Sequence, residues 1–428
     1  MSSADRSIRL LAWAIAARWF RPFAPLTALY FAQVTGSFAI GMLAVSASLV
    51  AQAVAEVPTG ILADRLGRAV VFRLAAFASL AAVACYAAGG TVLPGLPLLL
   101  IGAVLDGIGL AASSGNEDAL IHDALAAEGR AHDYGRERSR VASLTQFAGF
   151  VAVMIGTLLV TGSLRALVVV SLAPAVVAAV LSLAVRDTPV IQSHEPTRRP
   201  HLAPVSTSLR VLRDDRVLLA LFGTALLAGV LGSVVWALQP AFYALFLPLA
   251  VVGPLLSLNF LESAVGFRVS WRITTRFGRA RTLLVAEAAS RVGALVAVLA
   301  AAPWSPFGLA ASGMGYPPAE TARNALLMER YPATARATIA SVLALAISLL
   351  SAGLAPIAGA LTDRAGVGAA MAVMQACLLP SLVVYVWINR RIGLVAPATT
   401  AARRAAGGSV EPPDPGSASA SPRPSGPA

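Results

Sequence analysis

The turn Gly60-Ile-Leu-Ala-Asp-Arg-Leu-Gly-Arg-Ala69 lies between two long apolar runs of the chain. A short, arginine-bearing turn between two membrane-length helices is typical of a tight hairpin on the cytoplasmic side of a bilayer. Its first glycine allows a neighbouring helix to approach closely, and its second permits a turn that a side chain would block. Its charged side chains can form a latch with the end of an adjacent helix. The alternative is an ordinary positively charged loop that happens to contain glycine. The residues predicted to form the latch are Gly60, Asp64, Arg65, Gly67 and Arg68.

The composition of the whole chain agrees with a membrane protein. Hydrophobic residues make up 57% of the sequence, charged residues only 13%, and the mean hydropathy is +0.75. A soluble protein of 428 residues with this composition would aggregate. Twelve spans of about 20 residues with short loops fill this length. The sequence therefore predicts an all-α integral membrane protein with twelve transmembrane helices.

The net charge of +12 would suggest a nucleic-acid partner in a soluble protein. Here the charge follows the predicted topology, because all but three of the 33 basic residues fall on the side placed in the cytoplasm. Arg165 and Arg364 fall in predicted outer loops, and Arg291 lies within a predicted helix. We therefore expect a multi-pass protein of the cell membrane with both termini cytoplasmic. Its lipid partner is a bilayer with an anionic inner leaflet, and no nucleic-acid partner is expected.

Every basic residue of the chain is arginine, and lysine is absent. Phosphate-binding loops of the GxxxxGK[ST] type, kinase chemistry and Schiff-base chemistry each need a lysine, so the sequence excludes them. Cys85 and Cys377 fall in separate apolar segments and predict no disulfide framework. No convergent cluster of His, Cys and carboxylate residues stands out, so we expect neither an enzyme nor a bound metal or cofactor. Uphill transport would draw on an ion gradient or on a partner chain.

Polar connections divide the apolar segments into two halves. An N-terminal six-helix bundle is predicted over 24–185 and a C-terminal one over 216–391, joined by the polar, arginine-rich cytoplasmic linker 186–215. The first six helices are predicted near 24–41, 43–63, 70–89, 94–116, 141–161 and 165–185, and the second six near 216–237, 248–268, 282–302, 304–325, 337–359 and 367–389.

Both ends of the chain are predicted to lie outside the bundles. The N-terminal segment 1–23 is expected to be cytoplasmic, with residues 7–20 as an amphipathic segment on the inner membrane surface. The C-terminal tail 392–428 is rich in Ala, Pro, Ser and Gly and is expected to be disordered in the cytoplasm.

The two halves resemble each other in sequence at corresponding turns. Asp64–Ala69 has a counterpart in Thr275–Ala280, although Thr275 replaces the aspartate. Such duplication is expected of two pseudo-symmetric bundles that surround a central cavity and rock against each other.

Several of these segments resemble the major facilitator superfamily of transporters. The pattern G-x-L-A-D-R-x-G-R at 60–69 is similar to that family's signature loop between its second and third transmembrane helices. Glu56–Gly60 looks like the same place in many bacterial members, Ser114–Asp123 resembles a segment common in bacterial exporters, and Arg336–Ser341 is similar to a recurring motif. The resemblance covers 24–391 and implies a small-molecule substrate, alternating access and a monomer.

The sequence differs from the family's drug/proton antiporters in two places, so assignment to drug/proton antiport stays open. Many of those antiporters carry R-x-x-x-G in the fourth helix, where this chain has Ala103-Val-Leu-Asp106-Gly107. Their fifth helix also carries a glycine–proline motif, and Phe147–Val160 contains no proline.

Two acidic residues within predicted helices are candidates for proton coupling. Asp106 lies near the middle of its helix, where a charge is costly and usually functional. It would bind a proton or a cationic substrate, and the alternative is a carboxyl group that holds helices together. Glu262 is the second candidate, with structural pairing to an arginine as its alternative.

Polar side chains at helical spacing predict faces that turn toward a cavity, because lipid offers them no hydrogen bonds. The alternatives are close helix packing for the first helix and an interfacial anchor for Trp236. Glu287 and Arg291 are four residues apart, in the order that favours an ion pair, and are interpreted as neutralising each other. The substrate-cavity candidates are Tyr30, Gln33, Ser37, Ser113, Trp236, Gln239, Asn259, Tyr316 and Glu320.

These features favour a secondary transporter that exports a small amphipathic molecule, a drug or a metabolite, with proton exchange as the driving reaction. Nutrient uptake by symport is the alternative within transport, and the segment at 114–123 favours export. A non-transporting receptor or assembly partner built on a transporter fold is the alternative from another class, and Thr275 in place of aspartate keeps it open.

Overall fold

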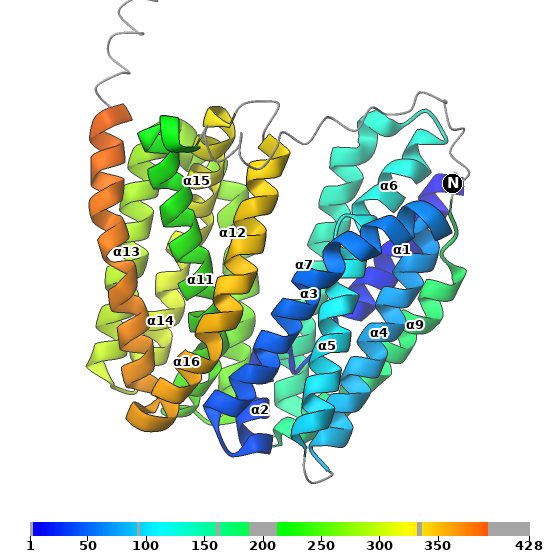
Figure 1. The fold of residues 1–428 in the computed structure, drawn as a ribbon, viewed down its shortest axis with the longest axis horizontal. Coiled ribbons are helices and arrows are strands. Elements are labelled where there is room, and N and C mark those ends of the chain that lie inside the picture. The colour runs from blue at the N-terminus through cyan, green and yellow to red at the C-terminus, as the bar shows by residue number, and fades with distance from the viewer. Residues whose placement is uncertain (1–2, 92–94, 160–162, 188–211, 332–335, 393–428) are drawn as a thin grey trace, which may run out of the picture.

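The computed structural model of the chain contains two helical bundles, which Figure 1 shows side by side. The structure describes residues 3–91, 95–159, 163–187, 212–331 and 336–392. Within these ranges every regular element is a helix, which confirms the all-α prediction.

The first bundle contains the long helices of the N-terminal half, and two of its spans are broken into shorter pieces. Its elements are α1 (Ser3–Trp19), η1 (Ala24–Leu26), α2 (Thr27–Thr35), α3 (Phe38–Leu66), α4 (Arg68–Gly89), α5 (Leu96–Ser113), α6 (Asn116–Ala126), η2 (Ala131–Asp133), α7 (Tyr134–Leu159), α8 (Leu164–Val170) and α9 (Leu172–Ala184).

The second bundle repeats this arrangement, with one interrupted span before its last two helices. Its elements are α11 (Arg216–Ala244), α12 (Leu249–Phe277), α13 (Arg279–Ala300), α14 (Ser305–Ser312), η3 (Gly313–Gly315), α15 (Tyr316–Arg330), α16 (Arg336–Leu378) and the helical residues 380–392.

Nine helical stretches of the described chain are long and apolar enough to cross a membrane. One of them, Ile339–Ile392, holds two spans, because the backbone of Gly366 is non-helical (φ 84°) and the ribbon turns back there (Figure 1). These nine stretches therefore contain ten spans. Two further spans consist of shorter helices, α1 with α2 and α14 with α15. The twelve predicted transmembrane helices are thereby accounted for.

The first span begins earlier than the sequence predicts. Helix α1 packs along α9 and α7, and its residues Ile8, Leu11 and Ile15 are buried in a cluster with Phe72. The prediction that 7–20 lies on the membrane surface is therefore wrong.

The break in this span follows from two prolines. Pro22 and Pro25 have no backbone N–H to donate, so the helix that ends at Trp19 cannot continue through them. Helix α2 then carries the chain onward and ends at Thr35, where Gly36 adopts a left-handed conformation (φ 73°). The helix predicted over 24–41 is thus the outer half of a longer, broken span.

The two bundles converge at one end of the molecule and diverge toward the other (Figure 1). We call the end that holds α2 and the turn of α16 the far end, and the end where α9 stops and α11 starts the linker end. At the far end α3 packs on α16, and α7 packs on α12 through Thr157 and Gly253. These contacts close the molecule at the far end.

Candidate functional site

A cavity of about 530 Å³ lies in the second bundle, between α11, α12, α13, α15 and α16. Gln146 of α7 adds one side chain from the first bundle. The lining extends toward the linker end as far as Asn324 and Leu343. Six of the predicted site residues share this cavity: Trp236, Gln239, Asn259, Glu262, Tyr316 and Glu320.

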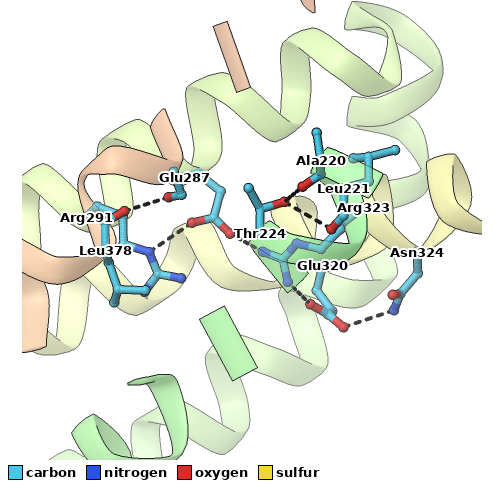
Figure 2. A network of polar contacts seen from close by, with 10 residues as sticks. Ala220, Leu221, Thr224, Glu287, Arg291, Glu320, Arg323, Asn324 and Leu378 are labelled. Carbon is cyan, nitrogen blue, oxygen red and sulfur yellow. Dashed lines mark hydrogen bonds and ion pairs between the residues drawn. The ribbon is translucent and has the colours of Figure 1, made fainter. Parts of the chain in front are cut away.

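Arg323 is the centre of a charged network beside the cavity, and Figure 2 shows Glu287 between Arg291 and Arg323. Arg323 Nη1 donates to Glu320 Oε2 at 2.7 Å, and Arg323 Nη2 binds Glu287 Oε1. Arg291 Nε donates to Glu287 Oε2 at 2.9 Å. Glu287 is 2% exposed and Arg323 is 5% exposed, so each charge depends on its partners rather than on water.

This network fixes the roles of two predicted residues. The predicted ion pair between Glu287 and Arg291 is present, but it is not self-contained, because Glu287 also binds Arg323. Glu320 accepts Arg323 on one carboxylate oxygen and the Asn324 amide on the other, at 3.0 Å. Both glutamates are therefore already neutralised within the protein.

Glu262 is the exception among the acids of this site. No hydrogen bond or ion pair joins it to another described residue, and its Oε2 lies beside Gly313. Arg291 and Arg323 are balanced by Glu287 and Glu320, so an ionised Glu262 would add one unbalanced negative charge to this site.

Aromatic rings form two walls near this acid. Trp236 and Phe260 make an edge-to-face pair with centroids 6.4 Å apart, and Tyr316 makes a similar pair with Phe267 at 6.2 Å. Trp236 is 42% exposed, so much of its ring is free to contact a ligand. Such rings bind flat apolar groups and cations.

A second cavity of about 320 Å³ lies where the two bundles meet, and Asp106 is on its wall. Trp236 lines both cavities, so the two spaces adjoin. Asp106 Oδ1 lies 2.8 Å from Arg21 Nη1, which comes from the break between α1 and η1. The carboxylate that the sequence marks as a proton carrier is therefore paired with an arginine.

A second ion pair lies one turn away along the first span. Arg18 is 4% exposed and its Nη2 lies 2.7 Å from Glu117 Oε1, at the start of α6. Neither Arg18 nor Arg21 was identified from the sequence, because both were placed in the cytoplasmic N-terminal segment 1–23.

Four predicted cavity residues line neither cavity. Tyr30 is 1% exposed and donates to the Tyr86 carbonyl at 2.6 Å, and Ser113 donates to Leu110 within its own helix. Gln33 is exposed on α2, and Ser37 caps α3. The single polar face predicted for the first helix is wrong, because the chain turns at Gly36 between Gln33 and Ser37.

The predicted latch turn joins α3 to α4. Gly67 has φ 95°, a conformation that disfavours a side chain, and Ala69 N donates to Asp187 Oδ1 at 2.8 Å. Arg68 Nη1 lies 2.6 Å from Asp123 Oδ2 and ties α4 to α6. Asp64 and Arg65 are exposed at the linker end.

The second bundle contains an equivalent ion pair between two of its helices. Arg279 follows Gly278 (φ 82°) as Arg68 follows Gly67, and it binds Glu329 on α15. The corresponding contacts support the internal repeat that the sequence suggests.

The chain is similar to known transporters in sequence pattern and in fold. The family model described as Major Facilitator Superfamily matches residues 10–353. The solved structure of the nucleoside transporter NupG is 12% identical, with a TM-score of 0.73 over 90% of this chain and 99% of that chain. No curated protein sequence matches the chain.

Two further solved structures have the same fold. A bacterial homologue of the human lysosomal transporter Spinster, inward-facing and unoccupied, is 15% identical, with a TM-score of 0.70 over 91% of this chain and 98% of that chain. The xylose transporter XylE from E. coli, inward open, is 16% identical, with a TM-score of 0.65 over 89% and 95%. At these identities the structural likeness shows the fold alone, whereas the family model spans most of the sequence. This multi-pass membrane protein belongs to the major facilitator superfamily and is a transporter rather than an enzyme.

Proposed function

We propose that this transporter exports a small amphipathic cation by alternating access, in exchange for a proton. The observation that carries this proposal is the carboxylate of Glu262, which has no described partner and lies in a cavity with aromatic walls. An anionic group among aromatic faces binds a cation that carries an apolar body.

The proton and the substrate would compete for the same carboxylate. Ionised Glu262 attracts a cation, and protonated Glu262 leaves the site neutral, so the cation leaves when a proton arrives. Asp106 is less suited to this exchange, because Arg21 already neutralises it. We therefore assign proton coupling to Glu262 and a structural role to the pair of Asp106 and Arg21.

The arginine-rich linker end would face the cytoplasm, as the positive-inside rule requires. The cavity extends toward this end, while the bundles meet at the far end. In this state a substrate would enter from the cytoplasm, and rocking of one bundle against the other would release it outside. The exporter-like segment Ser114–Asp123, most of it in α6, favours this direction over uptake by symport.

Binding of tetraphenylphosphonium, a lipophilic cation, tests the site. Titration calorimetry on the purified protein, in buffers of different ionisation enthalpy, measures both affinity and proton release. We expect Glu262→Gln to weaken binding about tenfold or more, since a tenfold change corresponds to the loss of about 1.4 kcal/mol. The intact protein is expected to release a proton on binding at acidic pH.

Glu56→Gln is the matched control, because it removes the same charge from an exposed position that lines neither cavity. Equal affinity in the Glu262→Gln variant and the intact chain would contradict the proposed role of Glu262. If neither protein bound the probe, the assignment of a cationic substrate would be wrong.

A further inference from the structure

The turn in α16 repeats the sequence of the predicted latch turn. Gly359-Ala-Leu-Thr-Asp-Arg-Ala-Gly366 matches Gly60-Ile-Leu-Ala-Asp-Arg-Leu-Gly67 in both glycines and in the leucine, aspartate and arginine between them. Gly67 and Gly366 also share a left-handed backbone, with φ 95° and 84°. The two copies lie at opposite ends of the molecule, one at the linker end and one at the far end.

At the far end, the aspartate of this second copy binds the start of α3 in the other bundle. Asp363 Oδ1 accepts from Phe38 N at 2.7 Å, and Asp363 Oδ2 accepts from Ala39 N at 3.0 Å. Ser37 Oγ donates to Asp363 Oδ2 at 2.6 Å. One carboxylate from the second bundle thus satisfies two free N–H groups of a 29-residue helix of the first.

The glycine of the second copy allows this approach. A methyl group on Gly359 would come within 2.8 Å of Ala39 Cα, so only glycine permits the two helices to lie this close. Further along α3, Ser46 Oγ donates to the Ala352 carbonyl at 2.6 Å, so the contact between α3 and α16 continues there.

A carboxylate at a helix N-terminus is stabilised by hydrogen bonds and by the positive end of the helix dipole. Because Asp363 and α3 belong to different bundles, this stabilisation exists only while the bundles touch at the far end. It therefore favours the state in which the cavity extends toward the linker end.

The first copy of the turn lacks the equivalent packing in the same structure. A methyl group on Gly60 would meet no atom within 4 Å, in contrast to one on Gly359. The beginning of α3 therefore packs against the second bundle at Gly359, whereas Gly60, near the end of α3, has no neighbouring helix against it.

We propose that Gly359 and Asp363 form a second latch, which closes the far end by capping α3. The two copies of the turn are engaged alternately, the far-end copy in the present state and the linker-end copy when the bundles close there. This inference rests on the alternating access of the proposed function, but its test requires no transport and no substrate.

Spin-label distances measure which end is closed. In a background with Cys85→Ser and Cys377→Ser, one pair of labels at Thr91→Cys and Leu245→Cys reports the far end. A second pair at Ala127→Cys and Met328→Cys reports the linker end. Asp363→Ala is expected to shift the population about five- to thirty-fold toward longer far-end and shorter linker-end distances, the range expected for losing a helix cap.

Asp363→Asn keeps part of the cap and should shift the population less, and it serves as the second variant if Asp363→Ala folds poorly. Asp215→Ala is the matched control, because Asp215 caps α11 within its own bundle and should leave both distances unchanged. Unchanged distances in both Asp363 variants would overturn the latch. A shift without any detectable transport would support the latch and count against the proposed function.

Discussion

Arg21 Nη1 lies 2.8 Å from Asp106 Oδ1, so an arginine from the break in the first span neutralises the acid in the middle of α5. This pair predicts the behaviour of two variants. Asp106→Asn leaves Arg21 unpaired beside a cavity and should lower the transport rate about tenfold or more, because an unpaired buried charge is costly. The double variant Arg21→Gln with Asp106→Asn should recover part of the rate.

The pH profile of that double variant separates two roles of Asp106. We expect the transport rate to keep its pH dependence, because the proposed function assigns proton coupling to Glu262 rather than to Asp106. The measurement is the initial rate of tetraphenylphosphonium transport in proteoliposomes between about pH 5 and about pH 8, the range in which folded proteins are usually most stable. Loss of the pH dependence would make Asp106 the proton carrier.

The network around Arg323 should matter more for stability than any exposed ion pair. Arg323→Met leaves Glu287 with one partner in a dry environment, for which the expected cost is about 3–5 kcal/mol. Thermal unfolding in detergent should show a large fall in the midpoint. Arg330→Gln is the control, because its partly exposed pair with Asp215 should contribute about 1 kcal/mol or less. Equal falls in the two variants would refute the structural importance of the network.

Asp64 is expected to stabilise the state in which the linker end is closed. Asp64→Asn should therefore insert into the membrane at normal levels and lose most transport, at least about tenfold, since the closed form loses a charge that interacts with a helix end. Transport rates are compared at matched membrane abundance. A normal rate would remove Asp64 from the latch.

The stability provided by Asp215 should depend on pH. Burial raises the pKa of this carboxyl, but the hydrogen bond from Leu218 N and the contact with Arg330 outweigh that effect and lower the pKa below its usual value. A lowered folded-state pKa gives stability that is present above the unfolded-state pKa of about 3.9 and is lost as the pH falls through the folded-state value.

Asp215→Asn should therefore lower the unfolding midpoint by about 1–2 °C near pH 7, and this difference should shrink between about pH 5 and about pH 3. Thermal unfolding across this pH range measures it. A difference that stays constant or grows on acidification would contradict the lowered pKa.

The long helices were predictable because their apolar runs are continuous. The polar residues of α11, α12 and α15 that line the cavity could be found from helical spacing, since each lies on one uninterrupted helix. The same reasoning gave a wrong prediction for Gln33 and Ser37, because the turn at Gly36 separates α2 from the start of α3. Spacing along the chain gives a shared face only when the helix between two residues is unbroken.

The first span could not be predicted from local sequence, and neither could the contact that extends the predicted pair of Glu287 and Arg291 to Arg323. Arg18 is buried and Arg21 is half-buried, and both depend on partners that are distant in the sequence, Glu117 and Asp106. The binding of Arg323 to Glu287 likewise joins two helices that are far apart in the chain. Charged residues within transmembrane segments are usually paired, and such partners are often distant in the sequence.

Untargeted mass spectrometry of cells and medium tests the central claim most directly. Cells that express the intact chain are compared with cells that express Glu262→Gln at the same membrane abundance. We predict that at least one amphipathic cation is depleted in cells and enriched in the medium only with the intact chain. Accumulation of such a compound inside the cells, or identical profiles for the two chains, would contradict export through Glu262.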